Sequence, residues 1–136
     1  MIRRSLVLAM LMLAGPLLSP IAVRGQEDGF QLVATWDGIR KCSGTPVTSP
    51  SPAFTVNNAP KGTATLEFHL TDLDAPHFNH GGGRVAYAGT KVAAGAFQFV
   101  GPCPPAGSTH RYEWTVTAFN ARGVRLAFAR ATERYP

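Results

Sequence analysis

The chain has 136 residues, which is enough for one domain, and its formal net charge is +5. Residues 1–25 contain three of the 13 Lys and Arg residues and none of the 8 Asp and Glu residues, so 10 basic and 8 acidic side chains remain after them. The resulting net charge of +2 is too small to indicate a nucleic-acid partner.

The first 25 residues have the pattern of a secretory signal peptide. Two arginines near the N-terminus precede an apolar run, Leu6–Leu18, and small residues follow up to Gly25. Gly15 and Pro16 interrupt this run, which is short for a membrane span, and an uncleaved anchor is the alternative. We expect cleavage near Gly25, which leaves a single domain, residues 26–136, that is periplasmic or secreted and has no membrane span.

Short segments with period-2 alternation, typical of β-strands, follow one another along the rest of the chain. No long segment has the 3.6-residue period of an amphipathic helix, and two irregular loops are predicted at 41–52 and 72–83. The expected fold class is all-β, an antiparallel β-sandwich or open barrel with little helix after the signal peptide. The predicted strands are Phe30–Trp36, Ala53–Val56, Thr63–Thr71, Arg84–Ala88, Ala96–Val100, Arg111–Asn120 and Val124–Thr132, the last at a sheet edge.

The predicted strand Thr63–Thr71 carries its apolar side chains on one face. Alternate residues from Leu66 to Leu70 are apolar, so this face packs in the core. In the same phase, Asp72 and Asp74 follow on the core side, where the strand ends. Because an unpaired buried carboxylate is costly, these two residues must line a pocket or find partners.

A second polar group lies at the start of the predicted strand Arg111–Asn120. His110 and Tyr112 share the core face of this strand. If the two strands are antiparallel, the end of one lies beside the start of the other. The aspartates, His110, Tyr112 and the loop 101–105 then meet at one end of the sheet.

This convergence predicts a small polar pocket whose wall is the proline-rich segment Gly101-Pro102-Cys103-Pro104-Pro105. Prolines reduce the entropy lost when such a loop is ordered. The amides of Gly101, Cys103 and Ala106 are expected to be free to donate to an anion.

Each of these features also has a plainer interpretation. The segment Asp72–Pro76 has the composition of an ordinary turn. His110 fits a structural histidine held by hydrogen bonds, and Tyr112 fits an ordinary core aromatic residue.

Cys42 and Cys103 are a candidate disulfide, because both lie in the part of the chain expected to reach an oxidising compartment. Alternatively, Cys103, His110 and Asp72 would be the nucleophile, base and orienting acid of a Cys/His hydrolase. A cysteine fixed between prolines, or consumed in a disulfide, is a poor nucleophile, so we do not expect an enzyme.

Two further motifs are too weak to indicate a cofactor. His77 and His80 are three residues apart but have no third ligand nearby, so no metal is expected. Gly81–Gly83 lacks the spacing of a dinucleotide-binding loop.

The segments DLDAP after a strand, GPCPP, and HRY at the start of a strand together resemble the phosphatidylethanolamine-binding protein family, most closely its bacterial Raf kinase inhibitor-like branch. The upstream run CSGTPVTSPSPAFTVNNAPKGTATLEFHLTDLDAP is similar to the family pattern as well. The resemblance covers Lys41–Asn120 and implies a β-sandwich around a large antiparallel sheet, with a small anion pocket at one end. Carried over residue by residue, it implies pocket positions at Asp72, Asp74, Pro76, Gly101, Pro102, Cys103, Pro104, Pro105, His110 and Tyr112.

The sequence departs from the family pattern at several positions. A further pocket histidine usual in the family falls on Gly83, although His80 is a candidate to reach in from the preceding loop. Leu73 replaces the usual proline between the aspartates. A C-terminal helix that commonly covers the pocket is not apparent, so we expect a shallower pocket.

The function expected from these observations is that of an exported binding module with a pocket for a small anion, such as phosphate or a phospholipid head group. The alternative is a protein-interaction or inhibitor module whose pocket is degenerate. The expected partners are therefore a small anionic ligand or a protein, and no nucleic acid or cofactor is expected.

Overall fold

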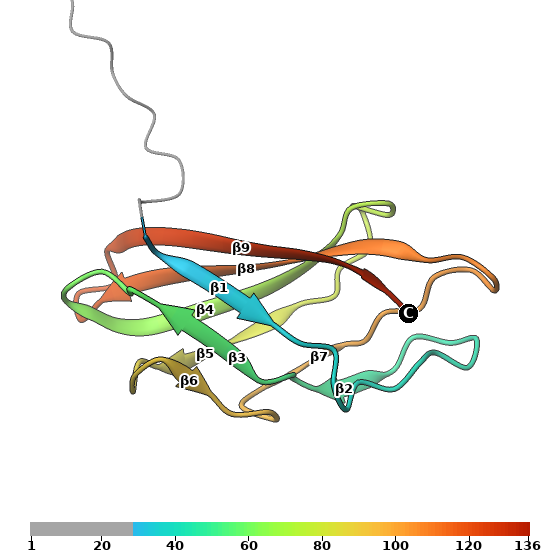
Figure 1. The fold of residues 1–136 in the computed structure, drawn as a ribbon, viewed down its shortest axis with the longest axis horizontal. Coiled ribbons are helices and arrows are strands. Elements are labelled where there is room, and N and C mark those ends of the chain that lie inside the picture. The colour runs from blue at the N-terminus through green and yellow to red at the C-terminus, as the bar shows by residue number, and fades with distance from the viewer. Residues whose placement is uncertain (1–28) are drawn as a thin grey trace, which may run out of the picture.

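Nine β-strands and no helix make up residues 29–136, the part of the chain that the computed structural model describes (Figure 1). The predicted signal peptide, residues 1–25, lies outside these described residues. Within the described range no helix is long and apolar enough to cross a membrane. The strands are β1 (Gln31–Ala34), β2 (Thr48–Pro50), β3 (Phe54–Asn57), β4 (Thr63–Asp72), β5 (Gly82–Ala86), β6 (Lys91–Val92), β7 (Gln98–Val100), β8 (His110–Asn120) and β9 (Arg125–Tyr135).

The strands form one larger sheet and two smaller ones. The larger sheet has the order β5-β4-β8-β9, the second β1-β3-β6, and β2 pairs with β7 as a two-stranded ribbon. All pairings are antiparallel. In Figure 1, β1 and β3 cross in front of the larger sheet, which gives the layered arrangement of a β-sandwich. The prediction of a mainly β, antiparallel fold is confirmed.

The core lies between the larger sheet and the smaller strands, and its centre is aromatic. Phe54 stacks on Phe68 with ring centroids 4.4 Å apart. Trp114 meets Phe54 and Phe99 edge to face, each at 5.1 Å. Aromatic pairs of this kind contribute about 0.5–1.5 kcal/mol each beyond burial of their area.

The alternation predicted for the two long central strands is confirmed. Leu66, Phe68 and Leu70 of β4 are buried, as are Trp114 and Val116 of β8. The C-terminal strand β9 lies at the edge of the larger sheet, as expected from its mixed pattern.

Three local predictions differ from the structure. The segment 41–52, predicted as a loop, contains β2, whose pairing with β7 follows from tertiary contact and not from local pattern. The two-residue strand β6 was not predicted, because it is too short to show a period. The strand predicted to begin at Arg84 begins two residues earlier, at glycines that carry no pattern.

The pairing of β4 with β8 brings the predicted site together. Their register places Asp72 directly opposite Tyr112. The loops that follow β1, β4 and β7 and the C-terminus all lie toward the same end of the sandwich, on the right in Figure 1. The antiparallel arrangement assumed from the sequence is therefore confirmed.

Candidate ligand-binding site

The carboxylate of Asp72 organises this end of the sheet. It is 4% exposed at the end of β4, and its Oδ1 accepts hydrogen bonds from the amides of Asp74 and Ala75 at 2.9 and 3.0 Å. Its Oδ2 accepts a hydrogen bond from Nδ1 of His110 at 2.7 Å. The turn interpretation of DLDAP is thus confirmed, and the carboxylate that closes the turn also binds His110.

His80 is a second imidazole at the site and is almost completely buried, with 2% exposed. Its Nδ1 lies 2.7 Å from the carbonyl oxygen of Val100. Because a carbonyl oxygen only accepts, Nδ1 must carry the hydrogen. Burial lowers the pKa of His80 and so favours the neutral ring, in which Nε2 is a hydrogen-bond acceptor.

Tyr112 lies behind these histidines and is 1% exposed. Its ring is perpendicular to that of His80 at 5.6 Å and roughly parallel to that of His110 at 6.3 Å. Burial raises the pKa of Tyr112, and the neighbouring Asp72 carboxylate raises it further, so the hydroxyl keeps its proton. This hydroxyl lies near the carboxylate of Asp72 and the backbone of Cys103, although it makes no hydrogen bond of normal geometry within the described residues.

Asp74 does not point into the core, which corrects the prediction from strand phase. Its Oδ2 accepts from the backbone amide of Arg111 at 2.7 Å, and its Oδ1 accepts from the guanidinium of Arg111 at 2.8 Å. These hydrogen bonds lower the pKa of Asp74 to about 2. The chain leaves the strand geometry after Asp72, so the phase no longer applies, and Arg111 offsets the charge of Asp74.

A cavity of about 400 Å³ lies among these side chains. Six residues singled out from the sequence line it: Asp72, Asp74, His80, Cys103, Pro105 and His110. Pro46, Ala75 and Phe78 also line it. None of these three was predicted as a lining residue, because their position depends on how the loops fold.

Five predicted pocket residues are not part of this lining, and one of them, Pro102, lines a different cleft. Pro76 is exposed on the loop after β4, and Pro104 lies beside the cavity wall without lining it. Tyr112 lies behind the wall, and Gly101 lines a different cleft. The amide of Gly101 donates to the carbonyl of Val47 at 2.9 Å, so the prediction that it is free for an anion is wrong.

Cys42 and Cys103 form a disulfide, with Cα atoms 5.0 Å apart. The bond ties the loop after β1 to the proline-rich wall of the cavity. A disulfide sulfur is not a nucleophile, so the Cys/His hydrolase alternative has no thiolate at Cys103 while this bond is intact.

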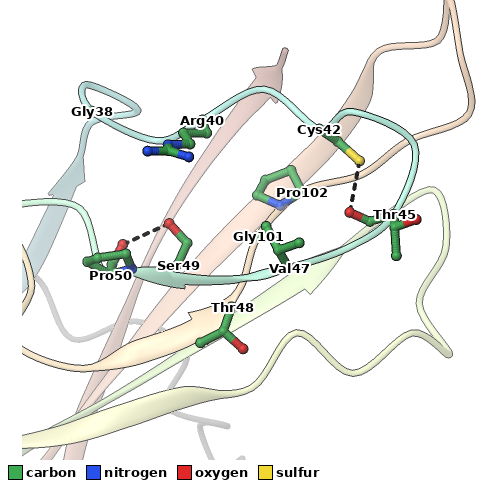
Figure 2. A pocket seen from close by; sticks show the side chains of 10 residues that line it. All are labelled: Gly38, Arg40, Cys42, Thr45, Val47, Thr48, Ser49, Pro50, Gly101 and Pro102. Carbon is green, nitrogen blue, oxygen red and sulfur yellow. Dashed lines mark hydrogen bonds between the residues drawn. The ribbon is translucent and has the colours of Figure 1, made fainter.

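A second cleft of about 310 Å³ adjoins the first on the other side of the disulfide. Figure 2 shows Arg40 at one side of this cleft and Cys42 at the other, with Val47 and Pro102 between them. Cys42 lines this cleft while Cys103 lines the first. The covalent bond is thus part of the partition between two hollows in the surface.

The family histidine that the resemblance places at Gly83 has no room there. Gly83 lies in β5 opposite Phe68, and a Cβ at this position would overlap the side chain of Phe97. Phe97 stacks on Phe68 at 5.5 Å as part of the core. The pocket imidazole comes instead from His80, three residues earlier.

Comparison with known proteins agrees with this architecture. No curated protein sequence matches the chain. Among solved structures, Escherichia coli YbcL, described as a new member of the mammalian PEBP family, is 19% identical with a TM-score of 0.58, covering 78% of this chain and 97% of YbcL. CT736 from Chlamydia trachomatis, described as a homologue of phosphatidylethanolamine-binding protein, is 18% identical with a TM-score of 0.52, covering 79% of this chain and 97% of CT736.

These two likenesses concern the fold, since both identities are low. The family assignment comes from the sequence model of the phosphatidylethanolamine-binding proteins, which matches residues 31–133 and so spans most of the chain, including every strand that borders the cavity. On that match, the chain belongs to the phosphatidylethanolamine-binding protein family.

Proposed function

We propose that this protein is an exported binding module whose pocket at Asp72, His80 and His110 takes a small anion with a phosphate-like group. The single observation that carries the proposal is the pair of imidazoles that line one cavity, each held by its Nδ1 in a hydrogen bond. Both rings are thereby fixed in orientation before any ligand arrives. Such preorganisation lowers the entropy lost on binding.

The charges at the site are compatible with an anion only when His110 is protonated. The carboxylate of Asp72 would repel a phosphate, but it accepts three N–H groups, and one of them belongs to His110. A protonated His110 neutralises Asp72 and offers Nε2–H as a donor to the ligand. Loss of this donor is therefore expected to weaken binding.

A protein-interaction role is the second candidate, and Phe78 is the observation that favours it. This side chain lies at the rim of the cavity, is 43% exposed, and packs on His80 with ring centroids 4.6 Å apart. An exposed aromatic residue beside a hollow is a common anchor for a partner. The protein-interaction role is the second candidate because one exposed aromatic ring is a small contact surface for a protein partner.

The test is an NMR titration of protein purified after expression of the full-length gene, with phosphate and then with phosphoethanolamine. We expect saturable shifts at the ring resonances of His80 and His110 and at the amides around Asp72. The variants Asp72→Asn and His110→Ala should weaken binding at least tenfold, by loss of a charge-assisted hydrogen bond. His69→Ala is the matched control, because His69 is exposed on the outer face of β4.

The outcomes separate the two candidates. Absence of shifts at millimolar ligand would contradict the anion pocket and direct the search to partners that bind around Phe78. Unchanged anion affinity in the His110→Ala variant would contradict the role proposed for the imidazole. Sequencing the N-terminus of protein recovered from the periplasm or medium tests export, with cleavage near Gly25 as the expected result.

A further inference from the structure

The two imidazoles at the cavity present nitrogens of opposite hydrogen-bonding character. In His80, Nδ1 donates to the carbonyl of Val100, which leaves Nε2 without a partner among the described residues. In His110, Nδ1 donates to the carboxylate of Asp72, which likewise leaves Nε2 without a described partner. The two rings therefore differ in the acceptor at Nδ1, which is a neutral carbonyl for His80 and a carboxylate for His110.

This difference decides what each Nε2 can do. When His110 carries a hydrogen on both ring nitrogens, Nδ1–H donates to the Asp72 carboxylate and Nε2–H is a second donor. Beside a neutral carbonyl and in an almost fully buried position, His80 is held in its neutral form, and burial lowers its pKa accordingly. The Nε2 of His80 is therefore a lone-pair acceptor at neutral pH.

We propose that the pocket selects oxyanions that carry a hydrogen, and so prefers a phosphate monoester or inorganic phosphate to a phosphate diester or sulfate. The P–OH group donates to Nε2 of His80, while a charged oxygen of the same ligand accepts from Nε2–H of His110. This inference rests on the proposed function and adds the protonation state of the ligand to it. His80 is the specificity-determining residue.

The physical reason for this preference is that two hydrogen-bond acceptors facing each other form no hydrogen bond, so the buried one is left unpaired. A diester or a sulfate has no hydrogen to donate, so its oxygen would meet the lone pair of the almost fully buried His80. A buried acceptor left unpaired costs about 1–3 kcal/mol, which corresponds to a discrimination of about fivefold to 160-fold. A site that must hydrogen-bond a group rejects an analogue that lacks it, for the same reason.

The pH range of this selection depends on the charged groups around both rings. Above about pH 6 the monoester loses its last hydrogen, so nothing is left to donate to Nε2 of His80 and the selection weakens. Where the pH falls far enough below the ordinary histidine range for His80 to gain a hydrogen, Nε2 becomes a donor and the discrimination is lost. The other titratable or charged groups around these rings are Asp72 from β4, Asp74 from the following loop, Arg111 and Tyr112 from β8, and Tyr135 from β9. His69 lies on the outer face of β4 and acts on His80 only through its charge.

None of those neighbouring groups is expected to reverse the preference for a ligand that carries a hydrogen. The pKa of Tyr112 and that of Tyr135 are both raised by burial, so these side chains stay neutral. Asp74 stays ionised because Arg111 lowers its pKa to about 2, and Arg111 compensates its charge. Asp72 keeps its three donors throughout this range.

The experiment is calorimetric titration at about pH 6 with three probes, methyl phosphate, dimethyl phosphate and sulfate, since about half of the monoester then retains one hydrogen. We expect methyl phosphate to bind at least tenfold more tightly than either of the others. The variant His80→Asn places an amide N–H where Nδ1–H donated to Val100 and removes Nε2. We expect its preference to fall below about threefold, while the control His69→Asn keeps the preference of the wild-type protein.

Each outcome of this titration tests either the ligand preference, the anion pocket or the role of His80. Equal binding of the three probes by the wild-type protein overturns the inference but leaves the anion pocket standing. Failure of every probe to bind overturns the proposed function as well. A preference that survives His80→Asn overturns the role of His80. If that variant does not fold, as shown by a loss of amide dispersion in its NMR spectrum, the comparison of the three probes on the wild-type protein still decides.

Discussion

Removing the disulfide between Cys42 and Cys103 should cost a large share of the stability of the domain. The two residues are 61 positions apart, so the bond closes a long loop in the unfolded chain. Chain-entropy theory gives about 14 cal/mol/K for a loop of this size, which is about 4 kcal/mol at 25 °C. Domains of this size are stable by about 5–15 kcal/mol in total.

The assay is urea unfolding of the wild-type protein and of the double variant Cys42→Ser/Cys103→Ser, followed by tryptophan fluorescence. We expect the free energy of unfolding to fall by about 4 kcal/mol and the melting temperature by roughly 15 °C or more. Reduced wild-type protein should match the double variant, because both lack the same cross-link. The exposed neighbour Ser43 offers a matched control, since Ser43→Ala should change stability by less than about 0.5 kcal/mol.

A loss below about 1 kcal/mol would refute this reasoning. It would mean either that the unfolded chain is already constrained between the two cysteines or that the bond strains the folded loops. Titration of unreduced protein with a thiol reagent belongs with this assay, and the expected result is no reactive thiol.

Three further predictions concern stability. Burial lowers the pKa of His80 in the folded state, so the unfolded chain binds more protons than the folded chain below about pH 6.5. The urea concentration at the unfolding midpoint should therefore fall between pH 7 and pH 5. The fall should be smaller in the variant His80→Asn, which lacks this imidazole. Gly83→Ala should destabilise the domain by about 1–3 kcal/mol in urea unfolding, because its Cβ would overlap Phe97, and a neutral result would mean that Phe97 repacks freely. Tyr135→Phe removes the hydrogen bond from its hydroxyl to the carbonyl of Ile39 and should cost about 1 kcal/mol by thermal melting, with no change in anion affinity.

The convergence at the site was predictable because strands impose a strict period of two. The alternation along β4 placed Asp72 on the buried face, and the same argument placed Tyr112 there on β8. One assumption, antiparallel pairing, then sufficed to bring the two together, and the register puts them opposite each other. Strand phase carries information about the site only as far as the strand continues.

Beyond the strand ends the same method failed, for a physical reason. Asp74 is two residues past the start of a turn, where the backbone no longer alternates, and its carboxylate turns outward to Arg111. The amide of Gly101 pairs with Val47 across the β2–β7 ribbon, and β2 has no local pattern that reveals it. Both features are set by contacts between segments far apart in the chain.

His80 lines the cavity from a position that strand phase does not predict. The position at Gly83, to which the resemblance assigns a histidine, lies in a strand where Phe97 fills the space beside it, so a side chain there would displace the core. The loop before β5 is free of that constraint and places the imidazole of His80 at the cavity, fixed by the Val100 carbonyl. The partner of Nδ1 in each imidazole bears on whether its Nε2 donates or accepts. Chemistry at this pocket should therefore be compared among relatives by the partner of each imidazole, because a histidine held by a carbonyl and one held by a carboxylate favour different ligands.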